Sequence, residues 1–193
     1  MSSQVSSEAR SGLNARQAET FERLLIAGAE ELRAVGHEAL TVRSVATRAS
    51  VSPATAYTYL ASKNHLFAEL FFRTLVAVEP PAFSDADGAR ERVRAVVRQY
   101  GELMVAEPEI AAAVTPALLG SDPEVERLRL RIGAEFVRRF ELALGAERDP
   151  DVVDALVLAF SGVLLQAGMG LVPYGQLADR LDAVNAVILK GNV

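Results

Sequence analysis

The chain of 193 residues contains no cysteine and only two histidines. Without cysteine it forms no disulfide framework, no thiolate metal site and no cysteine nucleophile. The two histidines, His37 and His65, make a poor ligand set for a transition metal without cysteines beside them. The sequence also has no glycine-rich phosphate loop and no recognisable spacing of a nucleophile and a base. We therefore expect no catalytic residues, no metal site and no cofactor, in a protein that is not an enzyme.

A second absence concerns acidic side chains near the amino end. The thirty residues between Glu38 and Glu69 contain no carboxylate, although an even spread would place about four there. The basic residues Arg43, Arg48 and Lys63 lie in the same stretch. A polyanion can approach such a surface without repulsion.

The chain as a whole is acidic, with a net charge of −5, which argues against nonspecific coating of nucleic acid. Residues 1–70 contain seven basic and seven acidic side chains, so the excess of acid lies in residues 71–193. The two parts of the chain are therefore expected to have different electrostatic roles.

The carboxylate-free stretch has the pattern of two short helices joined by a tight turn. Thr41 is a good N-cap, and the apolar residues that follow it share one face of a short helix. The sequence Ser50-Val51-Ser52 interrupts this helix, with Val51 as an apolar plug inside the turn. Ser52 can cap a second helix that begins at Pro53 and ends at about Leu60. The pattern predicts a helix-turn-helix, whose shape suits the DNA major groove.

Over about residues 20–70 the chain resembles the tetracycline-repressor-like (TetR) family of bacterial regulators. The matching residues are Thr41, Val42, Arg43, Val45, Ala46, Ala49, Val51, Ser52, Thr55, Tyr57, Ser62, Lys63 and Leu66. The chain departs from the family pattern at a few positions: His37 replaces an aromatic residue, Ser50 replaces the turn glycine, and Ala56 and Leu60 replace larger side chains. Ser50 must then adopt a left-handed or strained conformation.

The second short helix is the expected reading helix, because its side chains are small or hydrogen-bonding and none is acidic. Such side chains can approach phosphates and base edges closely. The resemblance implies DNA contacts from Thr41, Arg43, Ser52, Ala54, Thr55, Tyr57, Thr58, Tyr59 and Lys63. In the family's arrangement Arg43 can reach a guanine edge, whereas Thr41 and Lys63 hold phosphates.

Several of these residues also have a purely structural interpretation. Thr41 is either a phosphate contact or only a helix cap. Tyr57 and Tyr59 either face DNA or pack between helices, and Arg48 is either part of the basic surface or an ordinary surface charge.

The rest of the sequence keeps the apolar period of α-helices. A first helix is expected from about Ala15 to Val35, ended by Gly36, and Pro116 is expected to kink or end a short helix that Pro108 opens. The expected fold class is all-α, with about nine helices: a three-helix helix-turn-helix domain followed by a larger helical ligand-binding and dimerisation domain. The expected domains are a flexible arm over 1–14, the DNA-binding domain with its connecting helix over 15–79, and the ligand-binding and dimerisation domain over 80–193.

Residues 155–172 contain no charge and just reach the length of a membrane span. Polar residues and glycines dilute this segment, and aspartates crowd its amino end, so burial between helices is the preferred interpretation. We expect no membrane insertion. By the resemblance, this segment and the last helix, from about Tyr174 to Leu189, pair with their copies in a homodimer.

These features predict a ligand-responsive transcriptional regulator, a repressor in the family majority. A homodimer places two reading helices about 34–36 Å apart on double-stranded DNA, so it reads a palindromic operator. A small hydrophobic effector would release it. The candidate effector contacts are the expected inward positions Tyr100, Met104, Thr115, Phe136, Phe140, Phe160, Ser161, Gln166 and Met169, which could equally form ordinary core.

The remaining alternative is a helix-turn-helix adaptor that acts constitutively, without a ligand. The polar amino-terminal sequence has no apolar signal core, so the expected location is the cytoplasm.

Overall fold

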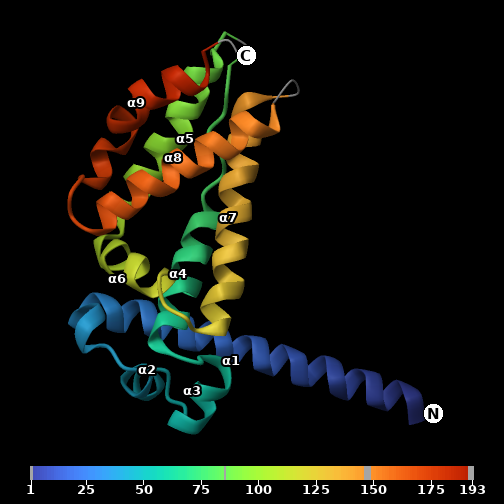
Figure 1. Cartoon of the computed structure of the whole chain (residues 1–193). Coiled ribbons are helices and arrows are strands. Elements are labelled where there is room, and N and C mark those ends of the chain that lie inside the picture. Colours follow the sequence, from blue (N-terminus) through green and yellow to red (C-terminus); the bar gives the residue numbers. More distant parts are fainter. Residues whose placement is uncertain (1, 85, 146–148, 191–193) are drawn as a thin grey trace. The chain divides into compact units, whose positions relative to one another are not determined.

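The computed structural model describes residues 2–84, 86–145 and 149–190, and within these ranges all regular secondary structure is helical (Figure 1). The elements are α1 (Ser2–Ala39), α2 (Val42–Arg48), α3 (Pro53–Tyr59), α4 (Lys63–Ala77), α5 (Ala89–Ala106), α6 (Pro108–Leu118), α7 (Pro123–Leu144), α8 (Pro150–Gly168), the short 3₁₀ helix η1 (Tyr174–Gln176) and α9 (Leu177–Ile188). The predicted all-α fold class with about nine helices is confirmed.

The chain divides into two compact units, Met1–Leu66 and Phe67–Val193. The division falls inside α4, whereas the expected domain boundary was between residues 79 and 80, after this helix. The first turn of α4 therefore belongs to the amino-terminal unit, and the rest of the helix belongs to the carboxy-terminal unit.

In the amino-terminal unit, α1 is longer than the sequence predicted, because it begins at Ser2 rather than near Ala15. Apolar residues at helical spacing begin only at Phe21, so the sequence pattern gives no indication of the earlier turns. At the other end Gly36 has φ 75° and ψ 169°, which breaks the regular helix where expected. Leu24, Leu25 and Leu32 of α1 are buried, and α1 packs against α2.

In the carboxy-terminal unit, α5 packs against α7 and α9, and α8 packs against α6, α7 and α9 (Figure 1). Aromatic rings fill the space between them. The ring of Tyr100 meets those of Phe136 and Phe160 edge-on, with centroids 5.5 Å and 5.3 Å away, and Phe140 packs on Phe160 at 5.5 Å. Such edge-to-face pairs add to the free energy gained by burial. Burial also raises the pKa of the Tyr100 hydroxyl.

Prolines lie at the start of three helices and inside one. Pro108 opens α6 as predicted, and Pro123 and Pro150 occupy the same first-turn position in α7 and α8. Pro116 lies inside α6, which continues to Leu118 before it ends. A proline in the last turn removes one helical hydrogen bond and does not prevent the helix from completing that turn.

Arg139 of α7 holds the end of α4 through a buried polar network. Its guanidinium donates to the carbonyl oxygens of Leu75 and Val78 at 2.7 Å and 2.6 Å. It also donates to the Glu135 carboxylate at 2.7 Å and to Oε1 of Gln99 at 2.9 Å. Arg139 is only 4% exposed, so this arginine compensates the last carbonyls of α4 in place of water.

Glu135 is the counter-ion of this network. Hydrogen bonds from Arg138 and Arg139 hold the pKa of the Glu135 carboxyl below its usual value, against the opposing effect of burial. A buried arginine is tolerated only when such a partner and enough acceptors surround it.

α8 is apolar but not buried on all sides. Among the described residues it is the one helix long and apolar enough to cross a membrane by length and composition, and 33% of its most apolar window is buried. Val152, Leu156, Phe160 and Val163 face the interior. The opposite face leaves Leu158 exposed, and α9 likewise exposes Val187.

We expect Arg139→Met to lower the free energy of unfolding by about 3–5 kcal/mol, because it leaves Glu135 and the α4 carbonyls without their buried partner. The measurement is urea unfolding followed by circular dichroism. Arg127→Met is the matched control, since Arg127 also pairs with a glutamate of α7 but its side chain is 74% exposed, and its loss should cost at most about 1 kcal/mol. Equal effects of the two substitutions would contradict the role given to Arg139.

Candidate nucleic-acid interface

A reciprocal cap at Thr41 starts α2. The Thr41 hydroxyl accepts a hydrogen bond from the Ser44 backbone N–H at 3.0 Å, and the Thr41 N–H donates to the Ser44 hydroxyl at 3.2 Å. This arrangement is a capping box, with serine in the place usually taken by glutamate or glutamine. Thr41 is thus a helix cap, as the structural interpretation proposed, and its exposed position leaves a phosphate contact open as a prediction.

The turn between α2 and α3 depends on Ser50. Its φ is 55°, which confirms the left-handed conformation that the missing glycine predicted. The Val51 N–H donates to the Ala46 carbonyl at 3.0 Å, and the Ser50 N–H donates to Thr47 at 3.1 Å. These two bonds form a Schellman motif, which ends α2 and satisfies its last carbonyls.

Ser52 then starts α3. Its hydroxyl accepts from the Thr55 N–H at 3.0 Å, and Pro53 occupies the first helical position, as predicted. Only Ala56 of α3 is fully buried. Ala54, Tyr57 and Thr58 are exposed, so this side of the helix is free to enter a DNA groove.

The two tyrosines of α3 have different surroundings. Tyr57 is half exposed, so packing between helices does not account for it. Tyr59 is partly buried and stacks on Phe21 of α1, with ring centroids 6.2 Å apart. For Tyr59 the packing interpretation therefore has direct support, and a DNA contact by this residue stays a prediction.

The three basic side chains of the carboxylate-free stretch make different numbers of contacts. Arg48 donates to Glu31 of α1 at 2.8 Å and lies 3.8 Å from Glu30. The hydrogen bond from Arg48 lowers the pKa of the Glu31 carboxyl, with a smaller contribution from Ser44. Arg48 is thus neutralised by α1, and the surface charge that the sequence suggested is smaller than the count of basic residues implies.

Lys63 and Arg43 complete the comparison. The Lys63 ammonium donates to the carbonyl oxygens of His37 and Glu38, both at 3.3 Å, where α1 ends. An ammonium has three protons, so one of them remains for a phosphate. Arg43 is exposed and has no side-chain partner among the described residues, which leaves its full charge available. The partners Glu31, His37 and Glu38 lie too far away along the chain for spacing alone to reveal them.

The predicted effector residues fall into three groups by burial. Tyr100, Met104, Phe136, Phe140 and Phe160 are buried together in the carboxy-terminal unit. Thr115 is partly buried on α6, so close to α8 that a Cβ on Gly168 would meet its hydroxyl at 2.2 Å. Ser161 and Gln166 are exposed on α8, and Met169 is exposed directly after its end. Their expected inward orientation is wrong, because the turn of α8 that buries Phe160 directs these positions away from the core.

Known proteins share both the motif and the whole fold. The family model described as bacterial regulatory proteins of the tetR family matches residues 24–70. Two relatives, each an uncharacterised HTH-type transcriptional regulator, come from Mycobacterium bovis and Mycobacterium tuberculosis. Each is 46% identical over 181 residues, which is 92% of this chain and 84% of the relative. The chain belongs to the TetR family of bacterial transcriptional regulators.

Solved TetR structures agree with this fold. A TetR transcriptional regulator from Rhodococcus has a TM-score of 0.74 at 19% identity, covering 91% of this chain and 97% of that one. A putative TetR regulator from Streptomyces avermitilis has a TM-score of 0.61 at 23% identity, covering 90% and 97%. Members of the TetR family are DNA-binding regulators rather than enzymes, in agreement with the expectation from the sequence.

For this TetR protein we expect Ser50→Gly to raise the free energy of unfolding by about 0.5–1 kcal/mol, because glycine adopts a positive φ without steric cost. Urea unfolding measures the change. Ser50→Ala is the matched control, since it removes the hydroxyl but keeps a Cβ at φ 55° and should not stabilise the protein. A less stable glycine variant would show that Ser50 is not strained.

Proposed function

We propose that this protein is a homodimeric repressor that binds a palindromic operator in the cytoplasm and is released by a small effector. One observation supports the DNA-binding part: α3 exposes Ala54, Tyr57 and Thr58, and Arg43 of α2 is exposed with no side-chain partner among the described residues, all within the stretch of sequence that contains no carboxylate. Arginine donates to guanine with two hydrogen bonds, whereas threonine and alanine contact bases or the thymine methyl group.

Specificity requires two copies of this surface. One seven-residue reading helix reaches only a few base pairs, and two copies spaced about 34–36 Å apart read successive major grooves of a palindrome. The exposed apolar faces of α8 and α9 are the surfaces that support dimerisation. Leu158 is 73% exposed and Val187 is 74% exposed, and side chains of this kind gathered on adjacent helices favour association with a matching surface.

We propose repression because a protein that binds an operator can block transcription by occupying that DNA alone. An effector can release such a dimer if it binds the DNA-incompetent conformation more tightly than the competent one. The rings of Tyr100, Phe136 and Phe160 pack tightly against one another and leave no room for an effector between them. If the effector site had to lie there, this packing would favour the alternative of a constitutive regulator. A screen of thermal stability against small hydrophobic compounds separates the two, because only the ligand-responsive protein should be stabilised.

Selection of bound sequences from random DNA should recover a palindrome. On that palindrome Arg43→Ala should reduce the preference over scrambled DNA by about 1–3 kcal/mol, because it removes a base contact. Lys63→Ala should weaken operator and scrambled DNA alike, because it removes a phosphate contact. Fluorescence anisotropy at fixed salt measures both. Equal losses on the two DNAs for Arg43→Ala would contradict the base contact.

We expect Leu158→Glu to convert the dimer to a monomer and to weaken operator binding, because it places a charge in an apolar interface. Sedimentation velocity measures the oligomeric state. Leu130→Glu is the matched control, since Leu130 is an equally exposed leucine, at 72%, on α7 rather than on α8 or α9. A dimer that survives Leu158→Glu would place the interface elsewhere.

A further inference from the structure

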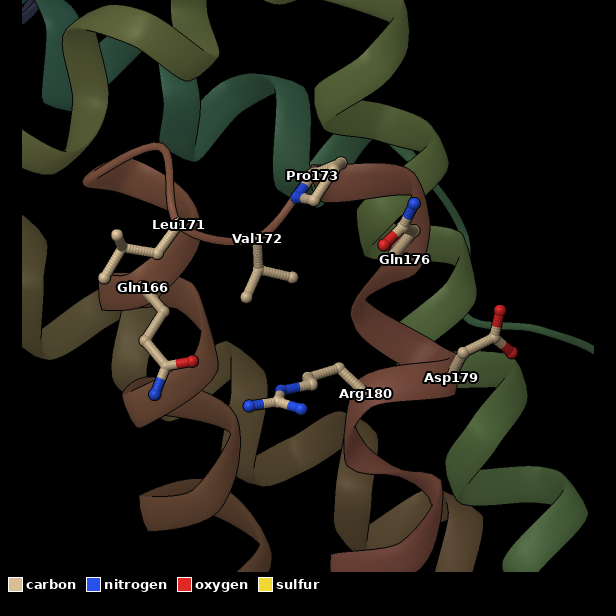
Figure 2. Close-up of a pocket in the computed structure, with 7 residues that line it drawn as sticks. All are labelled: Gln166, Leu171, Val172, Pro173, Gln176, Asp179 and Arg180. Carbon is tan, nitrogen blue, oxygen red and sulfur yellow. The ribbon is translucent and has the colours of Figure 1, made fainter.

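A groove lies where α8 turns into α9. It has a volume of about 800 Å³, and Gln166 of α8, Val172 of the connecting loop and Arg180 of α9 are among its lining residues (Figure 2). Binding sites for small molecules commonly measure about 300–1,000 Å³. The groove is therefore large enough for such a molecule, and it is separate from the packed aromatic rings.

The charge in this groove is uncompensated. Arg180 has no hydrogen-bond or ion-pair partner among the described residues. The neighbouring arginines of α5 are neutralised, since Arg90 pairs with Asp182 at 2.5 Å and Arg94 pairs with Asp179. Asp179, the one carboxylate that lines the groove, is thus already engaged with Arg94. The free guanidinium of Arg180 favours an anion.

The groove also has an amide and an apolar wall. Figure 2 shows the Arg180 guanidinium and the Gln166 amide directed into the same space from α9 and α8, with the Val172 side chain above them. The Gln166 side chain has no hydrogen-bond partner among the described residues. Leu171 and Pro173 are exposed in the loop that Gly170 starts at φ 77°. An occupant that covers them would gain free energy from the apolar surface it buries.

We propose that this groove binds a small amphipathic carboxylate. Arg180 pairs with the carboxylate, Gln166 donates a hydrogen bond to it, and the apolar part of the molecule covers Leu171 and Val172. Carboxylates suit this site because a guanidinium can donate two parallel hydrogen bonds to them. The assignment deepens the proposed function by naming the chemical class of the effector, and it rests on that function only for the consequence of binding.

The test uses octanoate as the probe and 1-octanol as its uncharged counterpart, with the full-length protein in isothermal titration calorimetry. We expect octanoate to bind about tenfold more tightly than 1-octanol. Arg180→Gln should reduce octanoate affinity about tenfold, and Arg180→Lys should retain part of it, because the charge remains but the fork of two donors does not. Arg98→Gln is the matched control, since Arg98 is also exposed but lies on α5 and does not line the groove.

Several outcomes would overturn the site. These are no binding of octanoate, equal binding of octanoate and 1-octanol, or equal affinity of the wild type and Arg180→Gln for octanoate. If Arg180→Gln separates the dimer in sedimentation, a second copy of the chain occupies the groove, and the site is also rejected. Binding of the operator without octanoate should be the same for the wild type and Arg180→Gln. If the protein selects no palindrome, the proposed function is refuted. The octanoate titration still tests the groove by itself.

Discussion

The DNA-binding surface depends on keeping two very short helices in one fixed arrangement. α2 and α3 have seven residues each, and helices of this length are unstable alone in water. Their ends are fixed by Thr41, by the left-handed Ser50 and by Ser52. Their inner faces are fixed by burial of residues such as Val45 and Ala56. Every base contact proposed for this protein requires both sets of interactions, because a reading helix that frays cannot hold its side chains in register with the groove.

Small residues occupy close contacts in the amino-terminal unit. A Cβ on Gly28 of α1 would lie 2.7 Å from a terminal methyl carbon of Leu66 at the start of α4, so a larger residue at position 28 would displace the Leu66 side chain. Ala56 is fully buried although it replaces a larger residue of the TetR pattern. Leu60 is also fully buried. The departures from the family pattern at these positions therefore keep the buried face apolar and leave the outer face of α3 unchanged in character.

Local chemistry made much of this fold predictable. Caps and prolines act within a few residues, so Thr41, Ser52, Pro53 and Pro108 located helix starts correctly, and the absence of glycine at position 50 correctly indicated a left-handed serine. Interactions between distant residues were not predictable from a single sequence. Arg48 with Glu31, Lys63 with the carbonyls that end α1, and Arg139 with the end of α4 all join segments that no periodic pattern connects. The orientation of α8 was missed for a related reason: an apolar helix gives no polar stripe from which to read its exposed side.

The exposed sides of α8 and α9 connect the two proposed surfaces of the carboxy-terminal unit. The apolar face with Leu158 and Val187 and the groove with Gln166 and Arg180 lie on the same pair of packed helices. A molecule in the groove that shifts α9 against α8 changes the shape of the face that a second copy must match. Linkage is reciprocal, so a carboxylate that binds one dimer geometry more tightly also makes that geometry more stable. In the proposed mechanism, effector binding is therefore coupled to the geometry of the dimer through two helices, without any change inside the packed aromatic core.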